Sequence, residues 1–139
     1  MIGPPIEYRK FQKYIEKEEP FKAIPSPTQA MLENLKEFMA CSCIFAISEF
    51  VVPPSHMKTS DFFSNSSGYV AVYAILSITA LRFKYYSAWK LSMFVVHASG
   101  ISYLEEKKNF HGVNHCNVRI IETSPHIREK IGNWNMTVQ

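Results

Sequence analysis

The longest uncharged stretch of the sequence is the feature that most constrains the fold. Between Asp61 and Arg82 no side chain carries a charge, and residues 69–81 are almost wholly apolar. A helix of roughly 20 such residues spans the hydrocarbon layer of a bilayer. Aromatic and basic side chains follow at once, as they do where a helix meets lipid headgroups. This stretch therefore predicts either a membrane-spanning helix or the buried helix of a helical domain.

The other segments also have the patterns of helices. Residues 6–19 predict an amphipathic helix that lies on a membrane surface or packs on a neighbouring domain. A second helix begins near Thr28, whose hydroxyl is expected to cap it, and becomes apolar over residues 38–52. A further apolar stretch covers residues 86–103, and a last helix covers residues 125–134. We therefore expect an all-α fold.

Composition leaves two interpretations of these helices open. The mean hydropathy of −0.09 favours a soluble helical domain. The two apolar stretches with adjacent aromatic and basic side chains favour multi-pass membrane helices accompanied by amphipathic interfacial helices. Basic residues occur on both sides of these stretches, so the sequence predicts no orientation in a membrane. The net charge of +3 is too small to indicate nucleic-acid binding.

Signals for metal and cofactor chemistry are weak. His111, His115 and Cys116 could seat a metal on a helix, but no second ligand pair with zinc spacing follows. A polar loop is the preferred interpretation, and we predict no metal site. Three cysteines give no disulfide framework. Serine-nucleophile and phosphate-loop motifs are absent from the sequence, and we predict no cofactor.

Several blocks of sequence, spread over nearly the whole chain, carry a resemblance in their order and spacing. The blocks are Gly3-Pro4-Pro5-Ile6-Glu7-Tyr8-Arg9-Lys10-Phe11, Arg82-Phe83-Lys84-Tyr85-Tyr86-Ser87-Ala88-Trp89, Ala98-Ser99-Gly100, Asn117-Val118-Arg119 and Trp134-Asn135-Met136-Thr137-Val138-Gln139. Together they resemble the membrane-bound O-acyltransferase family. The last block is similar to the family's Trp-Asn-x-x-Thr motif in its lysophosphatidylinositol acyltransferase branch. We call the second block the aromatic-basic stretch and the start of the last block the Trp-Asn motif.

The resemblance implies a fold, a location and a reaction. Members of this family are multi-pass helical proteins, usually of the endoplasmic reticulum membrane. In this branch they transfer a fatty acyl group from acyl-CoA, the co-substrate, to a hydroxyl of a lysophospholipid. A histidine acts as general base on that hydroxyl, which then attacks the thioester carbonyl. An asparagine holds and polarises the reacting groups in a water-poor chamber.

The resemblance also implies roles for individual residues. Asn135 matches the catalytic asparagine, and Trp134 and Thr137 would support its orientation. The aromatic-basic stretch would help to bind the acyl-CoA or the lipid, through the residues Arg82, Lys84, Tyr85, Tyr86 and Trp89. A plain interfacial anchor is the alternative interpretation of that stretch. A helix cap or a glycosylated asparagine is the alternative interpretation of Asn135.

Two departures from the family pattern affect the expected activity. The family's catalytic histidine lies on a later apolar helix. None of the five histidines of this chain matches its sequence context; they are His56, His97, His111, His115 and His126. Met93 occupies a position where related sequences often carry an acidic residue, which affects the expected headgroup. We therefore expect residues 1–139 to be an incomplete central portion of an acyltransferase domain, inactive alone. A non-catalytic helical membrane interaction module is the competing hypothesis.

Overall fold

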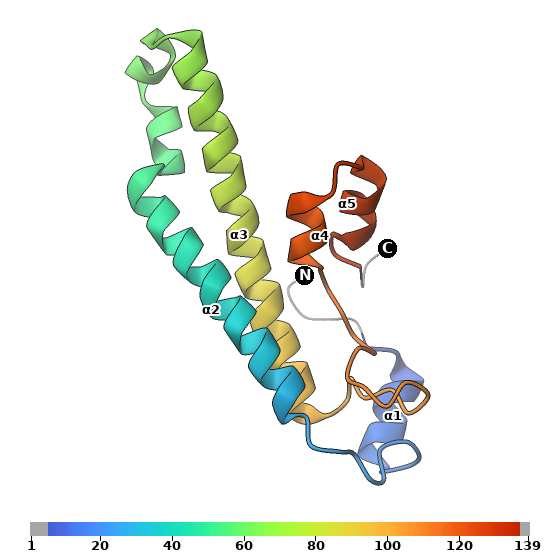
Figure 1. Ribbon diagram of the computed structural model, residues 1–139. Coiled ribbons are helices and arrows are strands. Elements are labelled where there is room, and N and C mark those ends of the chain that lie inside the picture. The colour runs from blue at the N-terminus through green and yellow to red at the C-terminus, as the bar shows by residue number, and fades with distance from the viewer. Residues whose placement is uncertain (1–5, 137–139) are drawn as a thin grey trace.

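A computed structural model of the protein describes residues 6–136 (Figure 1). The regular elements of this range are helices, which confirms the all-α prediction. An isolated antiparallel bridge between Leu104 and Asn109 closes a loop. The residues Gly3, Pro4 and Pro5 of the first sequence block and Thr137 of the predicted site lie outside the described residues.

A long helical hairpin forms the frame of the structure. Its arms are α2 (Thr28–Val51) and α3 (Ser67–Ser99), which lie side by side in Figure 1. The 3-10 helices η1 (Pro54–Lys58) and η2 (Ser60–Ser64) connect them at the tip. The apolar stretch 69–81 and residues 86–99 of the stretch 86–103 thus share α3, which also contains the aromatic-basic stretch; residues 100–103 lie beyond its end.

Local chemistry accounts for the ends of the two long helices. Proline cannot donate a backbone hydrogen bond, so Pro53 and Pro54 end α2. Ser66 caps α3 by accepting from the Tyr69 N–H at 3.4 Å. Gly100 ends α3 in the left-handed conformation with φ of 81°. The predicted cap at Thr28 is wrong, because the Thr28 hydroxyl bonds to that of Ser26 and Pro27 takes the cap position.

The N-terminal segment packs at the open end of the hairpin through α1 (Tyr8–Ile15). The Tyr14 hydroxyl donates to the Ser99 carbonyl at 2.7 Å, and the Tyr14 ring meets Phe21 edge to face. Tyr8 and Ile15 of α1 are exposed. This helix is shorter than the predicted 6–19, because Lys17 adopts a left-handed φ of 52° that no helix continues through.

The C-terminal segment forms two short helices beside α3 (Figure 1). These are α4 (Val118–Thr123), capped by the Asn117 side chain, and α5 (Ile127–Asn133), which agrees with the helix predicted over 125–134. Two backbone hydrogen bonds join the segments that flank them. The Asn117 N–H donates to the Asn133 carbonyl at 3.2 Å, and the Met136 N–H donates to the His115 carbonyl at 2.7 Å.

The half of the hairpin near its tip exposes much apolar surface. Its exposed large apolar side chains are Ile44, Ile47, Phe50, Val51, Phe63, Val72, Ile75, Leu76, Ile78 and Leu81. An apolar surface of this kind marks a region that contacts another apolar phase or molecule. Within residues 6–136, no helix combines a membrane-spanning length with sufficient apolar character.

Gly112 allows two backbone segments to approach closely, and replacing it tests the fold. A Cβ at this position would lie 2.6 Å from the Ser102 carbonyl oxygen, which accepts the Gly112 N–H at 2.9 Å. We expect Gly112→Ala to lower the free energy of unfolding by about 1–3 kcal/mol, because the backbone must move apart. Urea unfolding followed by circular dichroism measures this change.

Gly132→Ala is the matched control, because a Cβ there meets nothing within 4 Å. Since alanine is the better helix former, this change in α5 is expected to leave stability equal or slightly higher. Equal stability of Gly112→Ala and the wild type would contradict the close approach.

Candidate functional site

The structure brings the Trp-Asn motif against the aromatic-basic stretch. The Trp134 ring lies edge-on to Trp89, with 4.9 Å between the ring centroids. Its centroid is 5.6 Å from that of Tyr86 and 6.3 Å from that of Tyr85. Two sequence blocks far apart in the chain therefore form one aromatic cluster, which we define as Tyr85, Tyr86, Trp89 and Trp134.

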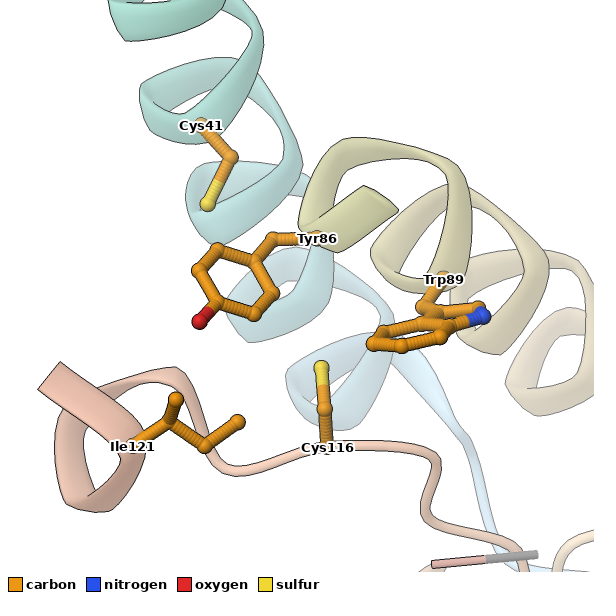
Figure 2. Close-up of a cluster of buried hydrophobic side chains, with 5 residues drawn as sticks. All are labelled: Cys41, Tyr86, Trp89, Cys116 and Ile121. Atoms are coloured by element: carbon orange, nitrogen blue, oxygen red, sulfur yellow. The ribbon is translucent and has the colours of Figure 1, made fainter. Parts of the chain in front are cut away.

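A buried core lies directly behind this cluster. In Figure 2 the Tyr86 ring lies between Cys41 of α2 and Ile121 of α4, and the Cys116 sulfur points up between Tyr86 and Trp89. Tyr86 and Cys116 have no exposed surface. Burial raises the pKa of the Cys116 thiol to about 11, so it remains protonated at neutral pH and acts as an apolar core residue. The aromatic cluster thus has a fixed support.

Glu122 joins two of the predicted binding residues. Its Oε1 accepts from the Tyr86 hydroxyl at 2.7 Å, and its Oε2 accepts from Arg82 Nη2 at 3.0 Å. The Arg82 Nε–H is buried and has no hydrogen-bond acceptor among the described residues. Sequence reasoning missed Glu122, since it belongs to no recognisable motif. The only sequence feature that could have indicated it is its position directly after the apolar residues Ile120 and Ile121.

Lys84 is placed away from the aromatic cluster. Its ammonium lies over the Phe45 ring of α2, 5.9 Å from the centroid. Residues two apart on a helix face different directions, so Lys84 and Arg82 cannot address the same site. The structure thus gathers Arg82, Tyr85, Tyr86, Trp89 and Trp134, whereas Lys84 contacts the other arm of the hairpin.

Asn135 lies just beyond the end of α5 in a left-handed conformation with φ of 52°. Asparagine is one of the residues that tolerate this conformation after a helix. Its side-chain Oδ1 is buried and accepts no hydrogen bond from the described residues. A buried carboxamide oxygen without a donor is available to a ligand. The hydrogen bond from the next residue, Met136, to the His115 carbonyl fixes this position.

A second polar site that sequence reasoning missed lies around Lys90. Its side chain is buried, forms an ion pair with Glu37 at 2.5 Å and donates to the Cys116 carbonyl at 3.2 Å. A pocket of about 160 Å³ opens beside it, lined by Glu33, Asn34, Glu37, Lys90, Met93, His111, Asn114, Cys116 and Asn117. The sequence signal for this site was Lys90 itself, a lysine inside an apolar stretch. Because an unpaired buried charge is costly, such a lysine indicates a partner of opposite charge.

His115 connects the two sites. Its ring stacks on Trp89, with 6.4 Å between the centroids and 21° between the planes. Burial lowers the pKa of His115, and the nearby Lys90 ammonium lowers it further, so its imidazole is neutral at pH 7. Of the three residues considered as metal ligands, His115 and Cys116 are buried in this core and His111 is exposed.

A pocket of about 250 Å³ lies between α3, α4 and α5. We call it the α3–α5 pocket, and it is lined by Arg82, Ile121, Lys130, Ile131 and Trp134. It combines two positive side chains with an apolar wall. Such a lining suits a ligand with a negatively charged group attached to an apolar part.

Tyr86→Phe tests the hydrogen bond to Glu122. A hydrogen bond to a charged group contributes about 1.5–3 kcal/mol, and we expect a loss of that size in the free energy of unfolding. In a double-mutant cycle, Glu122→Gln with Tyr86→Phe should give less than the sum of the single effects, as measured by urea unfolding. Tyr85→Phe, whose ring is half exposed, is the control. Additive effects of the two changes would contradict the contact.

The buried His115 predicts a dependence of stability on pH. Because its pKa is lower in the folded chain than in the unfolded chain, the unfolded chain binds more protons as pH falls below about 6.5. Stability contributed by the neutral imidazole is present above that pH and is lost below it. We expect His115→Asn to lose less stability between about pH 7 and pH 5 than the wild type does, by urea unfolding. The exposed His126→Asn is the control, and equal slopes for His115→Asn and the wild type would refute the assignment.

Comparison with known proteins finds similarity to membrane-bound acyltransferases. The chain is 34% identical over 116 residues to lysophospholipid acyltransferase 6 of Drosophila melanogaster, which covers 80% of this chain and 16% of the fly protein. It is 25% identical over 158 aligned positions to membrane-bound glycerophospholipid O-acyltransferase 2 of Rattus norvegicus, covering 98% of this chain and 30% of the rat protein. It is 26% identical over 89 residues to membrane-bound acylglycerophosphatidylinositol O-acyltransferase of Danio rerio, covering 64% of this chain and 19% of the fish protein.

The chain therefore spans less than a third of the length of these curated relatives. No family model matches the sequence. No solved structure matches it either. The three relatives are acyltransferases by name, and their similarity agrees with the order of the sequence blocks described above. The chain is thus homologous to a part of known membrane-bound O-acyltransferases.

Proposed function

We propose that the chain is a central portion of a lysophospholipid O-acyltransferase, which moves a fatty acyl group from acyl-CoA to a lysophospholipid hydroxyl. The names of the fly and rat relatives support a phospholipid substrate. Lysophosphatidylinositol is the proposed acceptor, supported by the form of the Trp-Asn motif and by the name of the fish relative. The small share of each relative that is covered supports an incomplete domain.

The observation that carries this proposal is the contact between Trp134 and the aromatic cluster on α3. It supports a shared site, because Asn135 directly follows Trp134 in the chain and has a buried Oδ1 that accepts no hydrogen bond from residues 6–136. In the proposed reaction this carboxamide holds a reacting group while the acceptor hydroxyl attacks the thioester carbonyl. A fixed dipole in a buried site is effective because it needs no reorganisation during the reaction.

The reaction also needs a general base that takes the proton of the acceptor hydroxyl. In the proposed enzyme a histidine outside this chain supplies it. Buried His115 lies beside the site and has a lowered pKa, but its ring stacks on Trp89 as part of the core. We therefore propose that the 139-residue chain has no transfer activity alone.

The proposed setting is the membrane of the endoplasmic reticulum, with the hairpin as part of a multi-pass arrangement. The names of the rat and fish relatives describe membrane-bound enzymes. The exposed apolar side chains of α2 and α3 near the tip support contact with lipid or with further apolar helices. The exposed Tyr8 and Ile15 of α1, next to Arg9 and Lys13, support an interfacial position for that helix.

An acyl-transfer assay tests the proposed role of Asn135. Membranes from cells that express the full-length protein receive radiolabelled acyl-CoA and lysophosphatidylinositol, and labelled phosphatidylinositol is measured. We expect Asn135→Ala to lower turnover by about 100-fold, as loss of one polarising group does. Asn133→Ala is the matched control, because among residues 6–136 the Asn133 side-chain amide donates to the Glu129 carbonyl within α5.

Equal turnover of Asn135→Ala and the wild type would remove Asn135 from the mechanism. The 139-residue chain assayed alone should give no labelled product, and product formation would show that it contains the base. No turnover by the full-length wild type would favour the non-catalytic membrane interaction module, for which the exposed apolar side chains of α2 and α3 are the supporting observation.

A further inference from the structure

Part of the Arg82 guanidinium has no hydrogen-bond partner among the described residues. Its Nη2 donates to Glu122 at 3.0 Å and to the Thr79 hydroxyl at 3.2 Å. Its Nε–H is buried and finds no acceptor within residues 6–136, although Arg82 lines the α3–α5 pocket. Leaving a buried donor unsatisfied costs free energy, and an oxygen atom of a bound ligand would remove this cost.

Lys130 adds a second positive charge to the same pocket. It lies half-buried on α5 and lines the pocket together with Arg82. Glu122 offsets one of these two positive charges, because its carboxylate pairs with Arg82. The pocket therefore favours a ligand group with a single negative charge and several oxygen atoms. A phosphodiester has this charge and these acceptors, and arginine and lysine are the side chains that bind phosphate oxygens.

The remaining lining of the pocket is apolar. Ile121 is buried at its inner side, and Trp134 and Ile131 complete the wall. Ile127 lies one turn before Ile131 on the same face of α5, and both side chains are more than half exposed. This stripe leads from the pocket to the surface. A volume of about 250 Å³ holds a headgroup linkage and leaves a long hydrocarbon chain to follow the stripe outward.

We propose that the α3–α5 pocket binds the phosphodiester of a single-chain phospholipid. Arg82 and Lys130 contact the phosphate oxygens, and the start of the hydrocarbon chain lies along Ile131 and Trp134. The proposal rests on the proposed function only for the choice of a lysophospholipid as ligand. It also assigns a binding role to Lys130, a residue that belongs to neither the aromatic-basic stretch nor the Trp-Asn motif.

Quenching of tryptophan fluorescence tests the proposal on the full 139-residue chain in detergent micelles, without acyl-CoA. The probe is a lysophosphatidylglycerol whose acyl chain carries bromine atoms near the ester. Both tryptophans report on it, since Trp134 lines the pocket and Trp89 contacts Trp134. The monoacylglycerol with the same brominated chain lacks the phosphate, and glycerol 3-phosphate, added as a competitor, lacks the chain.

We expect the phospholipid probe to bind about tenfold more tightly than the monoacylglycerol, and Lys130→Met to remove most of that difference. Arg128→Met is the matched control, because Arg128 is an exposed cation on the same helix that does not line the pocket. Arg82→Met should have an effect at least as large, provided that circular dichroism shows a folded chain. Lys130→Met remains decisive if Arg82→Met does not fold.

Three results would overturn the proposal. One is equal binding of the probe by Lys130→Met and the wild type. Another is an equal loss for Arg128→Met, which would indicate general charge attraction. The third is glycerol 3-phosphate competing as well as the intact lipid, which would indicate a site for free phosphate. Because no acyl donor is present, the result is independent of the transfer assay on Asn135.

Discussion

The packing of the C-terminal helices against the hairpin depends on the side chain of Tyr86. It is fully buried, and its ring packs between Cys41 of α2 and Ile121 of α4 (Figure 2). Its ring also meets Trp134, and its hydroxyl bonds to Glu122. The helices α4 and α5 are too short to be stable in isolation, so contacts of this kind keep them folded against α3. This one phenol thus contacts the aromatic cluster, the carboxylate that pairs with Arg82, and two residues that line the α3–α5 pocket, Ile121 and Trp134.

Much of the helical architecture could be predicted from local signals in the sequence. The prolines after α2 and the glycine after α3 end those helices by their backbone chemistry, and Pro125 as a helix start predicted α5. The failures were also local in origin. A left-handed Lys17 shortens α1, and Thr28 bonds to a neighbouring serine instead of capping α2. Neither outcome has a signature in residue spacing. The first is a backbone conformation that lysine rarely adopts, and the second is a side-chain hydrogen bond to a near neighbour.

The candidate site was predictable only where a motif and a helix face coincide. Arg82, Tyr86 and Trp89 recur three or four residues apart, so one face of α3 presents them together. Lys84 belongs to the same motif but points to the other arm of the hairpin, which helical geometry alone would have indicated. Glu122 and the Lys90–Glu37 pair could not be predicted, since each links distant segments through a single side chain outside any motif. Long-range pairs of this kind follow from the tertiary fold.

The two backbone hydrogen bonds between the segments around His115 and Asn135 have a consequence for how this protein can change. Both bonds use only main-chain atoms, from Asn117 to Asn133 and from Met136 to His115. Side chains at these positions therefore do not determine the register between the two segments. Evolution or engineering can vary the polarity next to Asn135, for instance at Met136, while the depth of the carboxamide in the fold stays the same. The polarity beside the proposed catalytic group and the placement of that group are thereby separable traits.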